Sequence, residues 1–230
     1  MSAGTRRLGL LGGTFDPIHY GHIDAALAAR EALSLDEVWL IPSHVPPHRA
    51  QQPAALPAHR LAMTALVAAE HPGLAASDIE LARHGLTYTS DTLAAIHALG
   101  WLPSQIFFIL GTDAFAEIAT WHRYPRVLDA AHFAIIARPG TSIDAAVSRT
   151  PDLRSRVSPL PVTDVPGRST RIFLVPAATR DVSSTSVRAR LAAKQPLDGL
   201  VPPSVERYIL TNHLYHAVTN LHGQVAGFTN

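Results

Sequence analysis

Short apolar runs alternate along this chain with alanine-rich stretches of helical length, and this alternation limits the possible folds more than any other feature. The apolar runs are short enough for buried strands, and they lie at Leu8–Leu11, Val38–Pro42, Ile106–Leu110, His132–Ala137 and Ile172–Val175. Alanine and leucine cost little to order in a helix, so helices are expected at Ile23–Leu33, His59–Ala69, Ser90–Leu99 and Ser184–Ala193. Strands that alternate with helices predict an α/β fold, a doubly wound, Rossmann-like parallel sheet with helices on both faces.

The length of 230 residues fits a single domain spanning 1–230. Hydrophobic residues make up 47% and charged residues 16% of the chain, which is typical of a globular protein and excludes a disordered one. Residues 139–170 are rich in Pro, Ser, Thr, Arg and Asp, so a surface insertion with room for one helix is expected there. Residues 216–230 contain Gly223 and Gly227 and are expected to form a flexible tail.

Charge and cysteine content exclude several kinds of partner and site. Lys and Arg number 19 against 18 for Asp and Glu, so the clustered basic surface that binds nucleic acid is not expected. The chain has no cysteine, which excludes disulfides, thiolate metal sites and cysteine nucleophiles. Gly12, Gly13 and Asp16 interrupt the first apolar run, so we expect a mature, cytoplasmic protein with no membrane partner. The sequence does not decide the oligomeric state, and a homo-oligomer is one of the alternatives.

The segment GGTFDPIHYGH, residues 12–22, follows the first predicted strand. Gly12 and Gly13 permit a tight turn and a close approach of the backbone to a ligand. Pro17 stiffens the turn, and a helix beginning near Tyr20 would direct its N–H groups and its positive dipole end to the same place. In a doubly wound sheet, ligands gather at the carboxyl ends of the strands. The segment therefore predicts an anion site.

His19 and His22 are three residues apart, so in one helical turn their rings would share a face and could donate hydrogen bonds to phosphate oxygens. One alternative is an ordinary glycine turn with two exposed histidines. Another is a metal site completed by His44 and His48, although the tight spacing of further ligands that such sites use is missing.

A second candidate phosphate site is SSTSVR, residues 183–188. Ser183 and Thr185 supply hydroxyls at a predicted helix start, and Arg188 adds charge one turn later. Alone, this segment would more often be an ordinary helix cap.

Together the two segments resemble the paired signatures of one known superfamily. Residues 12–22 resemble the signature Gly-x-Phe-x-Pro-x-His-x-Gly-His of the nucleotidyltransferase superfamily, and SSTSVR resembles its second marker, in the same order along the chain. The resemblance implies that His19, His22 and Arg188 act in catalysis. It implies an ATP site formed by Gly12, Gly13, Thr14, Phe15, His19, Gly21, His22, Gly111, Asp113, Ser183, Thr185 and Arg188, where Asp113 could equally be a helix N-cap.

Over nearly its whole length, from about Leu8 to Tyr215, the chain is similar to bacterial nicotinate-nucleotide adenylyltransferases, and the evidence for this lies between the two signatures. The similarity rests on five segments: PSHVPPHR (42–49), LTYTSDTL (86–93), FILGTDAF (108–115), TWHRY (120–124) and ARPG (137–140). Thr87 replaces the usual serine, and His122 replaces the common tyrosine. The similarity implies a nicotinate mononucleotide site formed by Asp16, His48, Arg49, Thr89, Ser90, Trp121, His122 and Arg138, with the Trp121 ring stacked on the pyridine.

The activity implied is adenylyl transfer from ATP to nicotinate mononucleotide, with Mg²⁺ bound through the ATP phosphates and no metal site on the protein itself. The mononucleotide phosphate is mostly ionised near neutrality and needs no catalytic base. Several alternatives remain: a nicotinamide-preferring or dual-specificity enzyme, a phosphopantetheine adenylyltransferase, a cytidylyltransferase, or a nucleotide-binding module without turnover.

Overall fold

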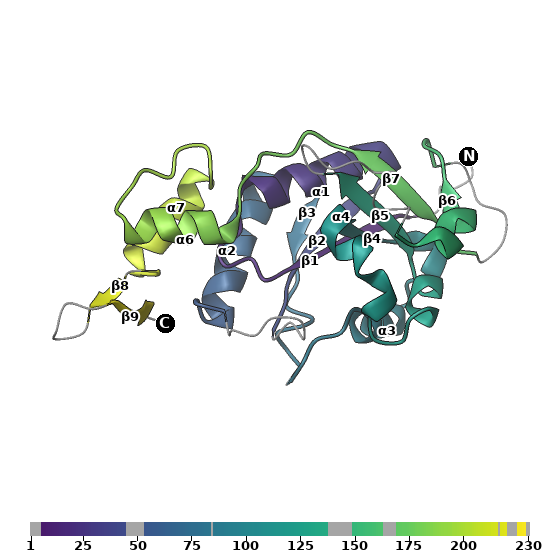
Figure 1. Cartoon of the computed structure of the whole chain (residues 1–230), viewed down its shortest axis with the longest axis horizontal. Helices are drawn as coiled ribbons and strands as arrows, with labels where there is room; N and C mark the ends of the chain where they lie inside the picture. Colours follow the sequence, from purple (N-terminus) through teal and green to yellow (C-terminus); the bar gives the residue numbers. More distant parts are fainter. Residues whose placement is uncertain are drawn as a thin grey trace.

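A parallel sheet of seven strands forms the centre of the molecule (Figure 1). This computed structural model describes residues 6–44, 53–83, 85–137, 149–162, 169–215, 217–219 and 225–228. The strand order is β3-β2-β1-β4-β5-β7-β6. The strands are β1 (Leu8–Gly13), β2 (Glu37–Pro42), β3 (Leu74–Ala76), β4 (Ile106–Gly111), β5 (His132–Ala137), β6 (Val157–Ser158) and β7 (Ile172–Pro176). All five strands predicted from the apolar runs are confirmed, whereas β3 and β6, at three and two residues, are too short to leave a pattern.

The helices of the described residues are α1 (Tyr20–Leu33), α2 (Pro57–Glu70), α3 (Thr89–Ala98), α4 (Thr112–Ala116), α6 (Ser184–Ala192) and α7 (Pro203–Thr211). Short 3₁₀ helices lie at Pro103–Gln105, Ile118–Thr120, Arg126–Asp129 and Pro151–Arg156. The four predicted helices are confirmed to within a few residues at each end. The sequence prediction missed α4, which has only five residues, and α7.

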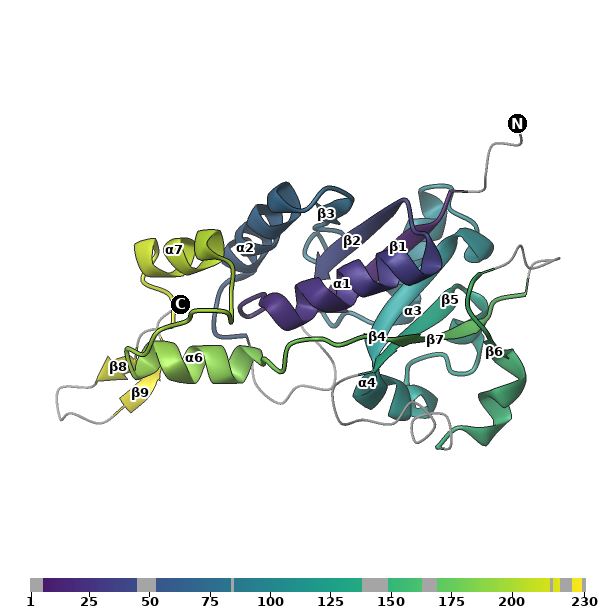
Figure 2. The same cartoon turned by 90° about the horizontal axis from the view of Figure 1, so that it is seen from above.

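The sheet is covered on both faces, as the prediction of a doubly wound fold requires. In β4, Phe107 and Ile109 point to the side of α1 and α2, and Phe108 and Leu110 point to the side of α3 and α4. All four are at most 7% exposed, which explains why the strand is apolar without interruption. Figure 2 shows α1 and α3 on opposite sides of the sheet.

The winding reverses between β1 and β4. Leu10 pairs with Trp39 of β2 on one side and with Phe108 of β4 on the other, all in parallel. The chain leaves β1 toward β2 and β3 and then returns across β1 to add β4, so the loops after β1 and β4 diverge. In this topology ligands bind in the crevice outside the carboxyl ends of these two strands.

The structure describes parts of the two outer segments, residues 139–170 and 216–230. Residues 149–162, within the segment expected to be a surface insertion, contribute the edge strand β6, and Leu153 is only 5% exposed because it packs into the core. Beyond Tyr215, β8 (Ala217–Thr219) pairs antiparallel with β9 (Val225–Phe228), so the expected tail contains a hairpin. Figure 1 shows it beyond α6 and α7.

Candidate active site

A cavity of about 790 Å³ opens at the carboxyl ends of β1 and β4. Its volume is in the range of sites that bury a small-molecule ligand. Twelve residues of the predicted nucleotide and catalytic sites line it: Gly12, Gly13, Thr14, His19, Gly21, His22, Thr89, Gly111, Trp121, His122, Ser183 and Thr185. The fold thus brings both signatures and the segments between them to one place.

The two histidines of the first signature stack on each other, as their spacing predicts. Their ring centroids are 3.7 Å apart and the ring planes differ by 24°. His19 is the N-cap of α1, and its main-chain N–H donates to Nδ1 of His22 at 3.3 Å. Because Nδ1 accepts this bond, a neutral His22 ring carries its proton on Nε2, and Nε2 is its donor.

The glycines of the first signature differ in what surrounds them. A Cβ on Gly13 would lie 2.6 Å from the Phe15 ring, and one on Gly21 would lie 3.0 Å from the carbonyl oxygen of Arg180. A Cβ on Gly12 would have no neighbour nearer than the Phe108 ring at 3.8 Å. Packing within the protein therefore requires Gly13 and Gly21, whereas at Gly12 a side chain would take up cavity space.

Arg60, which the sequence analysis did not select, holds the loops after β1 and β2 together. It is 0% exposed, and its Nη1 donates to the carbonyl oxygens of Thr14 and Ser43, both at 2.7 Å. Nε donates to the carbonyl oxygen of Ala55 at 3.3 Å. Burial lowers the pKa of Arg60, while the negative charge of Asp16 raises it. Because Thr14 and Ser43 line the cavity, Arg60 fixes this wall from behind.

The second signature caps α6 beside the first. Ser183 is the N-cap, and its Oγ accepts the N–H of Ser186 at 3.0 Å. The hydroxyl of Ser184 donates to the carbonyl oxygen of Pro17 at 2.9 Å and so joins the two signatures directly. The first residues of α1 and of α6 both line the cavity, so two positive helix ends meet there. This arrangement suits the phosphates of a nucleotide.

The far end of the cavity is aromatic. Trp121 stands edge-on to Phe108 with centroids 5.9 Å apart, and the His122 ring lies 4.4 Å from that of Tyr88. The hydroxyl of Ser90 is 3.0 Å from Nδ1 of His122. Thr89 and Ser90 begin α3, where first-turn N–H groups have no acceptor within the helix. This end can therefore hold a flat ring that carries an anionic group.

Four of the predicted residues lie behind the lining of the cavity or beside it. Phe15 is 0% exposed and packs in the core. Asp16 is 3% exposed and accepts hydrogen bonds from the main chain and from Tyr215. Ser90 supports His122 from behind, and Asp113 is an exposed residue in the first turn of α4, whose N-cap is Gly111.

Arg188 also lies beside the lining. It donates to the carbonyl oxygen of Asp16 at 2.6 Å, and its side chain is 18% exposed. The predicted residues His48, Arg49 and Arg138 lie outside the described residues.

Several lining residues were missed by sequence reasoning. Glu80 accepts a hydrogen bond from the Thr92 hydroxyl at 2.6 Å, and burial raises its pKa. Arg180 lies with its guanidinium carbon 3.8 Å from the centroid of Tyr20 and forms an ion pair with Asp24 at 3.3 Å. In the sequence, Glu80 precedes the segment 86–93 and Arg180 precedes SSTSVR (183–188), but neither residue belongs to one of the motifs.

Within the described part of the chain, no group of three or more His, Cys, Asp or Glu side chains is arranged to hold a metal ion. His44 thus forms no such cluster with His19 and His22, and His48 lies outside the described residues. No helix among the described residues is long and apolar enough to cross a membrane.

The comparisons with known proteins agree with this geometry. The cytidylyltransferase-like family matches residues 10–190. A Shewanella baltica protein named "Probable nicotinate-nucleotide adenylyltransferase" is 39% identical over 91% of this chain and 99% of its own length. An Aeromonas hydrophila protein of the same name is 41% identical over 90% of this chain and 96% of its own length.

Among solved structures, the Plasmodium falciparum nicotinic acid mononucleotide adenylyltransferase complexed with NaAD has a TM-score of 0.69 at 19% identity and covers 91% of this chain and 97% of its own. At that identity the likeness supports the fold alone. The family match and the two bacterial relatives cover most of the chain, and the chain therefore belongs to the cytidylyltransferase-like family and, within it, to the nicotinate-nucleotide adenylyltransferases.

Proposed function

We propose that this chain transfers the adenylyl group of ATP to the 5′-phosphate of nicotinate mononucleotide, giving nicotinate adenine dinucleotide and pyrophosphate in NAD biosynthesis. One observation carries the proposal: a single cavity joins a phosphate-binding end, built from His19, His22 and the start of α6, to an aromatic end built around Trp121. The relatives named as adenylyltransferases of this specificity support it.

The reaction needs alignment and charge stabilisation more than proton transfer. The phosphate of the mononucleotide has a second pKa of about 6 and attacks as an anion. Two anions must then meet in line, and donors that strengthen their bonds as charge develops on the phosphates lower the barrier. We assign this role to Nε2–H of His22, to His19 and to the first-turn N–H groups of α1 and α6. Arg188 adds positive charge one turn inside α6.

Mg²⁺ belongs to the proposal as a ligand of the ATP phosphates. When bound, Mg²⁺ neutralises charge on the phosphates. The residues of the two signatures then orient the α-phosphate.

Selection of nicotinate over nicotinamide is assigned to main-chain donors. The first-turn N–H groups of Thr89 and Ser90, together with the N–H of His122, would match the two acceptor oxygens of a carboxylate and oppose the NH₂ of an amide. Ser90 steadies His122 through the 3.0 Å contact to its ring. We further propose a cytoplasmic enzyme, since the absence of cysteine suits a reducing compartment.

Pyrophosphate release from Mg-ATP tests the proposal, with nicotinate mononucleotide and nicotinamide mononucleotide as separate acceptors. We expect kcat/KM to favour the nicotinate form strongly. Equal values would retain the transfer reaction and reject the assigned selectivity. ATP binding without pyrophosphate release from either acceptor would reject the enzyme and favour a binding module.

A further inference from the structure

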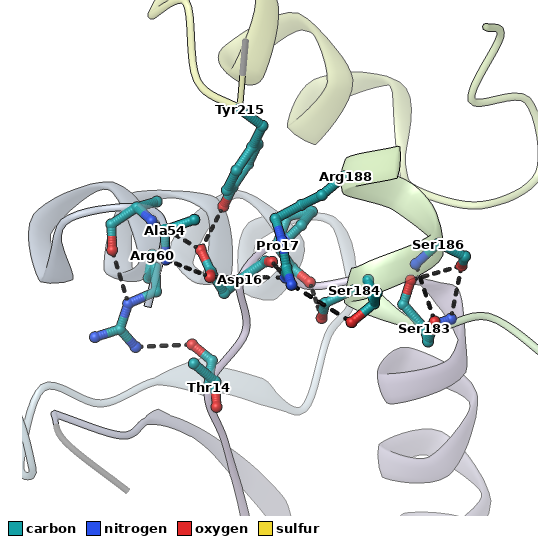
Figure 3. Close-up of polar contacts among 12 residues, drawn as sticks. Thr14, Asp16, Pro17, Ala54, Arg60, Ser183, Ser184, Ser186, Arg188 and Tyr215 are labelled. Carbon is teal, nitrogen blue, oxygen red and sulfur yellow. Dashed lines mark hydrogen bonds and ion pairs between the residues drawn. The ribbon is translucent and has the colours of Figure 1, made fainter. Parts of the chain in front are cut away.

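Four separate segments of the chain meet at the carboxylate of Asp16 (Figure 3). Its Oδ2 accepts the N–H of Ala54 at 2.8 Å, and its Oδ1 accepts the N–H of Ala55 at 3.0 Å. The hydroxyl of Tyr215 donates to Oδ1 at 2.9 Å. Nη1 of Arg188 lies 3.7 Å from Oδ2. We call these five residues the Asp16 junction.

The carboxylate of Asp16 makes its hydrogen bonds within the protein. A buried carboxylate is tolerated only when its oxygens are bonded, and here both oxygens accept from the chain while Asp16 is 3% exposed. Asp16 lies three residues before His19, so its fixed orientation sets how the chain enters α1. Ala54 and Ala55 follow residues 45–52, which include His48 and Arg49. The junction therefore joins the first signature to the part of the chain that follows residues 45–52.

Tyr215 brings the carboxyl-terminal part of the chain to this point. It lies 199 residues from Asp16 in sequence, is 0% exposed and follows α7. Burial and the neighbouring Asp16 charge both raise the pKa of Tyr215 above its ordinary value, so the phenol stays protonated and remains a donor. Tyr215 is not among the residues that line the cavity, so any effect on the reaction must pass through another group.

We propose that Tyr215 is a positioning residue for adenylyl transfer, whose hydroxyl holds Asp16 and thereby fixes the first signature with His19 and His22 directed at the nucleotide phosphates. The inference rests on the proposed function. Arg188 contributes to the same arrangement, because it donates to the carbonyl oxygen of Asp16 at 2.6 Å from the second signature. Tyr215 thus supports catalysis at a cavity that it does not line.

The test compares Tyr215→Phe with a matched control, Tyr208→Phe. Each change removes one phenolic hydroxyl from the carboxyl-terminal part of the chain. The hydroxyl of Tyr208 instead bonds Nδ1 of His59, in α2, at 3.0 Å. Steady-state kinetics of pyrophosphate release and urea unfolding are measured for wild type and for both variants in the full chain.

We expect Tyr215→Phe to lower kcat about tenfold with KM for either substrate changed less than about threefold, since misplaced donors weaken transition-state contacts more than ground-state binding. Tyr208→Phe should retain wild-type kcat. Wild-type kcat in Tyr215→Phe, or a loss of activity that merely follows the loss of folded protein, would overturn the proposal. A wild-type protein without pyrophosphate release would instead reject the proposed function itself.

Asp16→Ala gives a second test of the proposal. It removes the acceptor of the Tyr215 hydroxyl together with the other bonds of the carboxylate, so kcat should fall at least as far as in Tyr215→Phe. If the hydroxyl acts through Asp16, the double variant loses no more activity than Asp16→Ala alone. Losses that multiply in the double variant would mean that Tyr215 acts independently of Asp16 and would overturn the proposal.

Discussion

His132 in β5 makes the stability of the fold depend on pH. The residue is 3% exposed, and its ring stacks on Phe107 with centroids 4.7 Å apart. Its Nδ1 accepts the N–H of Arg171 at 2.8 Å. Burial, the largest cause, lowers the pKa of His132 from 6.5 to about 4. The folded protein therefore keeps this ring neutral under conditions in which the unfolded chain takes up a proton.

The sign and the size of the effect follow from linkage. Between pH 6.5 and about 4 the unfolded state binds more protons at this residue than the folded state does, so the free energy of unfolding falls as the pH falls. The stability that is lost in this way is fully present above pH 6.5, where His132 is neutral in both states. A difference of about 2.5 pKa units at about 1.4 kcal/mol per unit corresponds to a loss of about 3 kcal/mol on reaching pH 4.

Urea unfolding of the wild type and of His132→Gln at several pH values between 7.5 and 4 measures this loss. The substitution lowers stability at pH 7.5 because the ring is removed from the core. The wild type should nevertheless lose about 3 kcal/mol more than the variant across the range. Parallel curves for the wild type and His132→Gln would refute the reasoning.

Three further predictions concern the cavity. His22→Ala should lower kcat by about 10²–10³ while the folded fraction measured by circular dichroism stays at the wild-type level; wild-type turnover would remove the residue from the mechanism. Gly13→Ala should destabilise the fold by about 1–3 kcal/mol because its Cβ would lie 2.6 Å from a buried phenylalanine ring, whereas Gly12→Ala, with no atom nearer than 3.8 Å, should keep the melting temperature and raise KM for ATP; the opposite order of melting temperatures would contradict this. Ser90→Ala should raise KM for nicotinate mononucleotide several-fold with little change for ATP, and equal changes in both would argue against a local role.

The structure shows why some site residues could be found from the sequence and others could not. The two histidines of the first signature share a face because a spacing of three residues at a helix start is a local property of the chain. Phe15 and Asp16 belong to the same segment, yet their side chains turn into the core and the Asp16 junction. Spacing does not distinguish inward from outward side chains in a loop. Arg60 gave no signal either, since an arginine in an alanine-rich helix is usually exposed.

The sequence by itself determined the five longer strands of the sheet, four of the described helices, the parallel sheet with helices on both faces and the two candidate phosphate-binding segments. These properties depend on local periodicity, turn residues and helix capping, which short stretches encode. Only the tertiary structure decided which residues line the cavity and which support it. Arg60 reaches Thr14 across 46 positions, and Tyr215 reaches Asp16 across 199. Such contacts arise from the packing of distant segments, and nothing in the neighbourhood of either residue specifies the partner it will meet.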